Sequence, residues 1–216
     1  MKRIVVPGEI VTEERKRLGE HTFLRDGKIY SDCVGIAEED PKIASVVPLE
    51  GSYKPKINDI IIGIILSEEY AGYTVDINSF SRCFLLKEGI RDALKPTTVV
   101  SARISKVNEL NEADLTDSRP FFGGEIICVS SVKIPRIIGK NGSMLEVLKK
   151  GTGSVIVVGR NGRIWAKGGD IGLLVRAIEK IEREAHMEHL TNAMADFLSE
   201  GKPKEKLLEK TVGEEK

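Results

Sequence analysis

Two glycines three positions apart, with a cation between them, are the residues of this sequence best placed to do chemistry. Gly139 and Gly142 enclose Lys140 and Asn141, between an apolar segment and an amphipathic one. Glycine lets the backbone approach a ligand closely, the start of a following helix offers free N–H groups and a positive dipole end, and lysine adds charge. The stretch therefore predicts either a cradle for phosphate groups or an ordinary tight turn.

A second copy of the same pattern shows that the spacing alone is a weak signal. Gly159 and Gly162 enclose Arg160 and Asn161. This copy lies between two β-like runs, where Asn-Gly is a strong hairpin signal, so we predict a turn. Two arginines flank this turn, Arg160 and Arg163. They are either solvated surface side chains or contacts for a polyanion, and the sequence leaves both alternatives open.

The distribution of charge favours a polyanion contact near the first copy. The whole chain is formally neutral, with 33 basic and 33 acidic side chains. Residues 125–169, however, carry eight basic and two acidic side chains, which gives this segment a net charge of +6. The segments before and after it, 1–124 and 170–216, each have a net charge of −3. A basic module between mildly acidic ones is expected of a nucleic-acid-binding protein.

Hydrophobic patterning predicts two β-rich parts in the first half of the chain. Short β-like runs and turn signals, among them Asp26-Gly27, predict a small all-β domain over residues 1–54. Residues 55–120 have the pattern of five short strands with a helix-prone connector at 87–94. That pattern suits a partly open OB-type barrel of the S1 kind.

The second half of the chain has a different pattern. Residues 125–200 follow the order strand, helix, helix, strand, strand, helix, with Ser143 and Asp170 as the expected helix caps. The charge-rich tail at 201–216 is expected to be disordered. The predicted fold class is therefore multidomain β plus α/β.

The cysteines and the apolar runs indicate the compartment. No apolar run approaches the roughly 20 residues that a membrane-spanning helix needs, and the first residues lack the pattern of a secretory signal. Cys33, Cys83 and Cys128 are far apart and form no CxxC pair. We interpret them as buried small hydrophobes in a reducing cytoplasm, not as a zinc site or a disulfide framework. A cytoplasmic protein with no membrane partner and no cofactor is expected.

Catalytic and metal-binding patterns are weak. Three possible metal ligands have the spacing that places them on one face of a helix: Glu182, His186 and His189. Such triples are common and no further ligand is evident, so solvated side chains or a subunit contact are favoured. Glu68, Glu69 and Asp76 could serve a metal-dependent nuclease but are more simply a solvated edge. The sequence favours a non-catalytic binding protein, with such a nuclease as the alternative.

Three motifs, in this order, resemble one protein family. The loop "IIGKNG", followed by a helix, two strands and a long helix, resembles a KH domain. The preceding "YKPKINDIIIGIIL" and "GYTVDI" resemble an S1 domain of the exosome type, and "VVPGEIV" resembles that family's N-terminal β-domain. Together they cover nearly the whole chain, which resembles the KH-bearing RNA-binding cap subunit of the archaeal RNA exosome.

This resemblance implies a subunit without a catalytic site. It implies three such caps on a hexameric ring of PH-type phosphorolytic exoribonuclease subunits, docked through the N-terminal β-domain and guiding single-stranded RNA into the pore. A free-standing RNA-binding regulator remains a further alternative. Asn58 stands where the family usually has glycine before the first S1 strand, and asparagine also tolerates positive φ.

The expected RNA-binding residues fall into two groups. The KH-like part contributes the glycine loop and nearby cations: Lys133, Arg136, Gly139, Lys140, Asn141, Gly142, Arg160 and Arg163. The barrel contributes two tyrosines and two arginines: Tyr70, Tyr73, Arg82 and Arg103. S1 domains commonly carry two aromatics on the second strand, but here Thr74 follows Tyr73. Stacking a base on an aromatic ring is worth about 1–3 kcal/mol, and the second strand lacks one of the two rings. We therefore expect this barrel to bind RNA weakly and mainly to line a pore.

Overall fold

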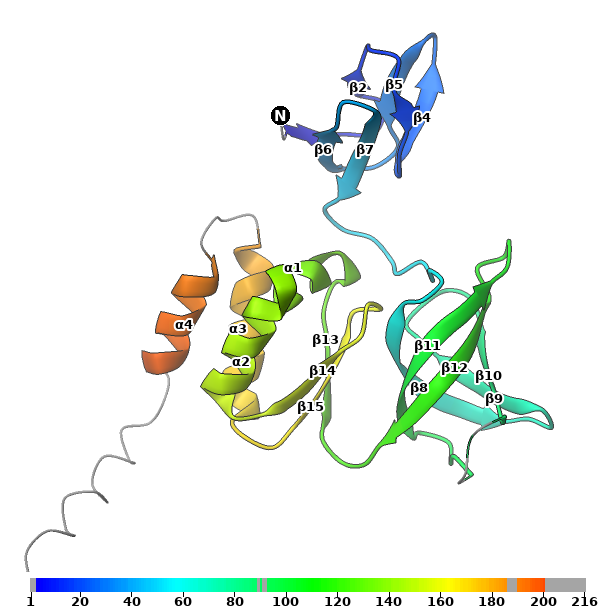
Figure 1. The fold of residues 1–216 in the computed structure, drawn as a ribbon, viewed down its shortest axis with the longest axis vertical. Helices are drawn as coiled ribbons and strands as arrows, with labels where there is room; N and C mark the ends of the chain where they lie inside the picture. The colour runs from blue at the N-terminus through cyan, green and yellow to red at the C-terminus, as the bar shows by residue number, and fades with distance from the viewer. Residues whose placement is uncertain (1–2, 89, 91–92, 186–189, 201–216) are drawn as a thin grey trace, which may run out of the picture. The chain divides into compact units, whose positions relative to one another are not determined.

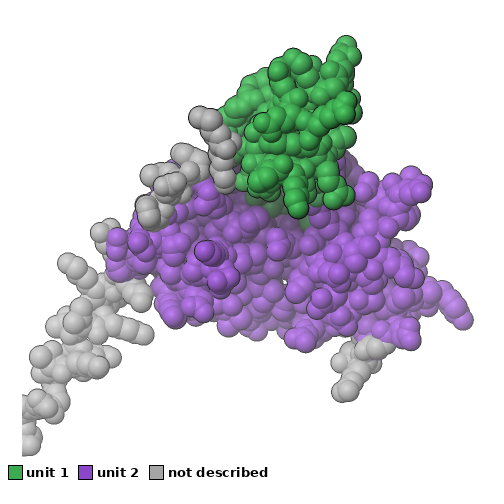
Figure 2. All heavy atoms as spheres, turned by 45° about the horizontal axis from the view of Figure 1, so that its top comes forward, with its two compact units in different colours: residues 1–53, 130–132 green, residues 54–129, 133–216 purple. Residues whose placement is uncertain are grey.

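The fold shown in Figure 1 comes from a computed structural model that describes residues 3–88, 90, 93–185 and 190–200. The chain forms two compact units, coloured separately in Figure 2: residues 1–53 with 130–132, and residues 54–129 with 133–216. The sequence-based predictions for His186, His189 and the tail at 201–216 fall outside the described residues. Among the helices that the structure describes, none is long and apolar enough to cross a membrane.

The first unit is an all-β domain made of two small sheets. Its described strands are β1 (Arg3–Val5), β2 (Ile10–Thr12), β3 (Arg17–Leu18), β4 (Thr22–Arg25), β5 (Lys28–Ser31), β6 (Gly35–Glu39) and β7 (Ile43–Pro48). They are ordered β1-β6-β7-β3 and β2-β5-β4. Alternate side chains of β6 and β7, among them Ala37 and Val46, are buried, as expected of strands with one face on a core. Asp26 and Gly27 both have positive φ, 49° and 78°, which confirms the predicted β4–β5 hairpin.

The second unit begins with a closed barrel. Its strands are β8 (Ile60–Glu68), β9 (Gly72–Asp76), β10 (Cys83–Leu86), β11 (Val99–Val107) and β12 (Ala113–Phe121), in the order β10-β12-β11-β8-β9. A parallel pairing of β10 with β12 closes the barrel, while the other pairs are antiparallel. The predicted OB-type barrel is confirmed. Asn58 has φ 70°, so it serves the turn before β8 as expected. The helix-prone connector at 87–94 is not helical at its described residues.

The second unit continues with a domain in the predicted KH order. It consists of β13 (Glu125–Cys128), α1 (Ile134–Ile138), η2 (Lys140–Gly142), α2 (Ser143–Thr152), β14 (Val155–Val158), β15 (Arg163–Lys167), α3 (Ile171–Arg183) and a further helix, α4 (Leu190–Glu200). Between β13 and α1 the chain forms η1 (Ser131–Lys133), whose first two residues belong to the first unit. The antiparallel sheet has the order β13-β15-β14, and α1, α2 and α3 lie on one face of it (Figure 1). Asp170 caps α3 as predicted, because its carboxylate accepts from the Leu173 N–H at 2.8 Å.

Aromatic packing joins the end of the barrel to this domain. The Trp165 ring on β15 stacks on Phe121 at the end of β12, with ring centroids 4.2 Å apart. Its indole N–H donates to the Gly123 carbonyl at 2.9 Å. Gly124 has φ 82°, and a Cβ there would stand 2.6 Å from the Ala166 carbonyl oxygen. The short link between the two domains is therefore packed tightly against β15.

Candidate nucleic-acid interface

The glycine loop lies between α1 and α2, and its backbone conformation requires glycine. Gly139 has φ 75° and ψ 173°, a region essentially confined to glycine. A Cβ at this position would stand 2.7 Å from the backbone nitrogen of Met144. Asn141 and Gly142 follow in the left-handed region, with φ 54° and 81°. Lys140 and Asn141 are exposed, so the loop presents both of its side chains to solvent.

Helix α2 begins directly after this loop without a side-chain cap. The N-cap position is Gly142, and Ser143 is the first helical residue, so the prediction that Ser143 caps the helix is wrong. The Ser143 N–H donates to the Lys140 carbonyl. The N–H groups that follow Ser143 in the first turn have no acceptor four residues earlier within the helix, and they carry the positive end of its dipole. This helix start can therefore receive an anion such as a phosphate.

Further cations stand in the segment that leads into the loop. Arg136 is exposed on α1, and Lys133 is half-buried at the end of η1. Within the described part of the chain, no acidic side chain forms an ion pair with Lys133, Arg136 or Lys140. Their charges therefore remain available to a polyanion, and RNA contact by these residues stays a prediction.

The second copy of the glycine pattern faces inward and joins the KH-type domain to the barrel. Asn161 is fully buried, at 0% exposed. Its Nδ2 donates to the carbonyls of Ile62 and Ile77, both at 2.8 Å, and its Oδ1 accepts from the Ile62 N–H at 3.1 Å. The Arg160 N–H donates to the Ile60 carbonyl at 2.9 Å. β9 pairs with β8 only as far as Ile64. The turn therefore takes over the hydrogen bonds of β8 at Ile60 and Ile62, where β9 no longer pairs with it.

Arg163 is an internal residue, which corrects the expectation that it is available to RNA. Its side chain is 8% exposed and donates to the Asp76 carbonyl and carboxylate, both at 2.7 Å. Burial raises the pKa of Asp76, but hydrogen bonds from Arg163 and the Asn78 N–H, with the arginine's charge, lower the pKa below its ordinary value. Arg160 is exposed, so it stays a predicted RNA contact.

The two tyrosines predicted in the barrel have different environments. Tyr73 is 2% exposed, and its hydroxyl accepts from the Leu94 N–H at 3.2 Å. A base cannot stack on a ring buried in this way, so the prediction for Tyr73 is wrong. Tyr70, at the turn between β8 and β9, is fully exposed, and Phe80 is 93% exposed. These two rings are available for stacking.

The two barrel arginines are both exposed, but they have acidic neighbours. Arg82 lines a groove of about 460 Å³ that also contains Phe84 and Lys106. The same groove is lined by three carboxylates: Glu69, Glu112 and Asp114. Arg103 pairs with Asp117, with 3.3 Å between Nε and Oδ2. The excess of carboxylates over cations in the groove disfavours a polyanion. Sequence reasoning missed Lys106, whose only signal was its charge within a predicted strand.

The carboxylates suggested for a nuclease do not converge. Glu68 pairs with Lys87 at 2.8 Å, and Glu69 accepts from the Thr74 hydroxyl. Asp76 is held by Arg163. Among the described residues, these three carboxylates form no cluster close enough to share a metal ion.

The three cysteines also differ from one another. Cys83 is buried, and burial raises the pKa of its thiol to about 11. Cys33 is half-buried and Cys128 is exposed on β13. The expectation of buried small hydrophobes is therefore correct for Cys83 and wrong for Cys128.

A closed OB-type barrel followed by a KH domain with a solvent-facing glycine loop defines a modular class of nucleic-acid-binding protein. Comparison with known proteins narrows the class. Residues 2–50 match the family model of the exosome RNA-binding protein RRP4 N-terminal domain, and residues 124–172 match the KH domain model.

Curated relatives identify the family. The exosome complex component Rrp4 of Thermococcus kodakarensis is 33% identical over 91% of this chain and 85% of its own length. Rrp4 of Methanosarcina acetivorans is 35% identical over 95% of this chain and 85% of its own length. A crystal structure described as that of an exosome complex RNA-binding protein matches with a TM-score of 0.62 at 29% identity, over 69% of this chain and 97% of the other. The chain belongs to the Rrp4 family of exosome complex components.

Proposed function

We propose that this chain is a non-catalytic RNA-binding cap subunit of an exosome-type complex that degrades RNA in the 3′-to-5′ direction. It recruits single-stranded RNA and guides it into a hexameric ring of PH-type phosphorolytic exoribonuclease subunits. The observation that carries the proposal is the exposed Lys140-Asn141 loop, set between two glycines at the uncapped start of α2. The Rrp4 relatives are named as exosome complex components, which supports the same complex for this chain.

In this proposal the N-terminal domain, residues 1–54, docks on the ring, and three copies sit on each hexamer in the cytoplasm. Two observations support docking through this domain. It matches the RRP4 N-terminal domain model, and it exposes large apolar side chains, among them Ile4 (66%), Val6 (52%) and Leu24 (59%). Exposed apolar side chains that gather on one small domain favour a protein–protein contact.

The barrel, residues 55–120, is proposed as a secondary RNA contact. Tyr70 and Phe80 offer exposed rings for stacking, and Arg82 and Arg103 offer charge. The carboxylates around Arg82 oppose that charge. The KH domain, residues 125–200, therefore supplies most of the affinity, and the barrel mainly lines the path of the RNA.

Two simple experiments separate this proposal from its alternatives. Incubating the purified chain with labelled RNA, with and without Mg²⁺ and phosphate, should produce no cleavage. Cleavage that needs a divalent ion and disappears in Glu68→Gln would favour a nuclease. A free-standing regulator would remain monomeric when mixed with a PH-type ring, whereas a cap should co-elute with it in size-exclusion chromatography.

The decisive experiment compares two variants with the same change of charge, one in the glycine loop and one in the last turn of α2. Lys140→Asp with Asn141→Asp changes the loop by three negative charges and keeps both glycines. Lys149→Glu with Lys150→Gln makes the same change at the exposed C-terminal end of α2. Lys149 and Lys150 lie six and seven residues after the first residue of α2, which at 1.5 Å per residue is about 9–11 Å along the helix axis and exceeds a Debye length of about 8 Å. The control therefore tests whether charge acts at the loop or over the domain as a whole.

The loop variant should bind unpaired RNA at least tenfold more weakly, a change of about 1.4 kcal/mol. If the loop and nearby cations neutralise about three to five phosphates, log affinity should fall with log salt at a slope of roughly −2 to −3.5, and the loop variant should flatten it. The control should keep both properties, and both variants should melt like the parent because the altered side chains are exposed. Unaltered affinity and slope in a folded loop variant would contradict the proposal.

A further inference from the structure

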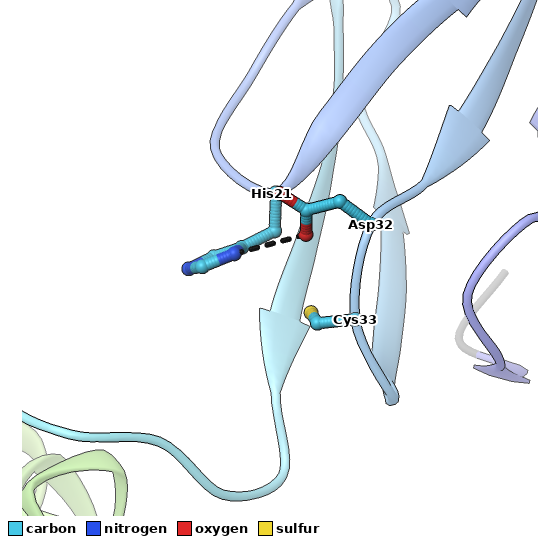
Figure 3. Close-up of side chains that lie close together, drawn as sticks. All are labelled: His21, Asp32 and Cys33. Carbon is cyan, nitrogen blue, oxygen red and sulfur yellow. Dashed lines mark hydrogen bonds and ion pairs between the residues drawn. The ribbon is translucent and has the colours of Figure 1, made fainter.

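The N-terminal domain brings together three side chains that are common metal ligands: His21, Asp32 and Cys33 (Figure 3). A ring nitrogen of His21, a carboxylate oxygen of Asp32 and the Cys33 Sγ all lie within 4.8 Å of one another. His21 Nδ1 is 3.1 Å from Asp32 Oδ1. Within the described part of the chain, this is the one such group of three or more. Nothing in the proposed RNA-binding function uses it.

The strand register holds these three residues in place. In the β4–β5 hairpin Thr22 is opposite Ser31, so His21 and Asp32 face each other across the open end of the hairpin. The Asp32 N–H donates to the His21 carbonyl at 3.3 Å. The buried Ser31 hydroxyl donates to the Cys33 carbonyl at 2.6 Å and accepts from the Cys33 N–H at 3.3 Å. The backbone that carries the three ligands is therefore already fixed by hydrogen bonds.

The separations between the ligand atoms are close to those of a tetrahedral site. Zinc binds nitrogen and oxygen at about 2.0–2.2 Å and sulfur at about 2.3 Å, so the ligand atoms around it are roughly 3.3–3.8 Å apart. The His21–Asp32 distance of 3.1 Å is close to this range. The largest separation is at most 4.8 Å, and small rotations of the half-buried His21 and Cys33 side chains would close it.

A simple ion pair explains these observations less well. The His21 and Asp32 side chains are 25% and 52% exposed, and an ion pair with that exposure contributes about 0–1 kcal/mol. It does not account for the thiol beside the pair.

We propose that His21, Asp32 and Cys33 bind a divalent transition metal, and that Zn²⁺ is the ion that this nitrogen, oxygen and sulfur set fits best. Water completes the coordination. The metal ties the connection before β4 to the connection after β5 and so clamps the open end of the hairpin. This inference departs from the sequence-based expectation that the cysteines form no zinc site.

The test titrates Zn²⁺ into the full chain, after metal has been stripped with a chelator, in competition with a chromophoric chelator. We expect one equivalent to bind. Cys33→Ser and His21→Gln should each weaken binding at least tenfold, because each removes one of three protein ligands. Cys128→Ser removes an exposed thiol elsewhere and should leave binding unchanged, as should His186→Gln with His189→Gln. Co²⁺ in place of Zn²⁺ should give a thiolate-to-metal charge-transfer absorption that Cys33→Ser abolishes.

A second measurement needs no variant. In the parent chain Zn²⁺ should protect Cys33, but not Cys128, from alkylation, as mass spectrometry of the digested chain can show. The inference is overturned if no equivalent of Zn²⁺ binds, if both ligand variants bind as the parent does, or if Cys33 is alkylated equally with and without Zn²⁺. In each of these cases His21 and Asp32 form an ion pair only.

Discussion

Removing the Asn161 side chain should destabilise the joint between the barrel and the KH domain. The Asn161→Ala substitution leaves three buried groups without a partner: the Ile62 N–H and the carbonyls of Ile62 and Ile77. Each unpaired buried group costs about 1–3 kcal/mol. Because water can enter the space left by the amide, we take the lower third of the combined range and expect a loss of about 3–5 kcal/mol in the free energy of unfolding.

The expected shift in melting temperature is large enough to measure without ambiguity. For 150–250 residues, 1 kcal/mol corresponds to roughly 2–4 °C, so the loss predicts a fall of about 6–20 °C. Trp165 is the sole tryptophan of the chain and stacks on Phe121 beside this joint. Its fluorescence therefore reports the melting of the second unit separately from that of the first. Hydrogen exchange of the Ile62 amide, followed by NMR, should also accelerate.

Two companion variants sharpen the test. Arg160→Ala removes an exposed side chain and keeps the backbone N–H that bonds Ile60, so it should stay within about 0.5 kcal/mol of the parent. Asn161→Asp keeps an acceptor for the Ile62 N–H but sets a carboxylate oxygen against two carbonyls. It should be at least as destabilising as alanine. The reasoning is refuted if Asn161→Ala melts within 1 °C of the parent and leaves the exchange of the Ile62 amide unchanged.

Gly139→Ala should lower the denaturant midpoint more than Gly142→Ala: both have positive φ, but only at Gly139 would a Cβ meet backbone, at 2.7 Å. At pH 8, iodoacetamide should modify Cys128 and spare Cys83, whose pKa of about 11 keeps the reactive thiolate scarce; early Cys83 modification, seen by mass spectrometry, would count against this. Deleting residues 1–50 should abolish co-elution with a PH-type ring while single-stranded RNA binding persists, and retained ring affinity would contradict docking through this domain.

Local signals predicted most of the fold. The Asp26-Gly27 hairpin, the Asp170 cap and the KH-type order of elements depend on residues that are close in sequence, where turn chemistry and hydrophobic periodicity are decisive. The glycine loop was found for the same reason. Its flanking helical segments are local, and the segment's net charge can be counted from the sequence alone.

The errors for Arg163 and Tyr73 concern contacts between residues distant in sequence. The sequence predicts that Arg163 is a surface cation, because no local signal shows that Asp76, 87 positions earlier, lies against it. The sequence predicts that the Tyr73 ring is available for stacking. In the structure the closed barrel buries this ring, and the Leu94 N–H, 21 positions later, donates to its hydroxyl. His21 and Cys33 become neighbours only through the register of the β4–β5 hairpin. Periodicity predicts that a side chain faces inward or outward, but not which distant residue covers it.

The hydrogen bonds of Asn161 and Arg163 have a consequence for how a polymer would bind. They hold the barrel and the KH domain together, so the spacing between the barrel surface at Tyr70 and the loop at Lys140 is set by the protein and not by a flexible linker. If an RNA is held at the loop, as we propose, its contact with the barrel becomes intramolecular, at an effective concentration fixed by that spacing. Because the two domains are already held together, forming the second contact does not cost the entropy of fixing one domain relative to the other. Affinity should therefore rise in a step at the RNA length that first reaches from one surface to the other, and the chain would in effect measure the length of the single strand that it receives.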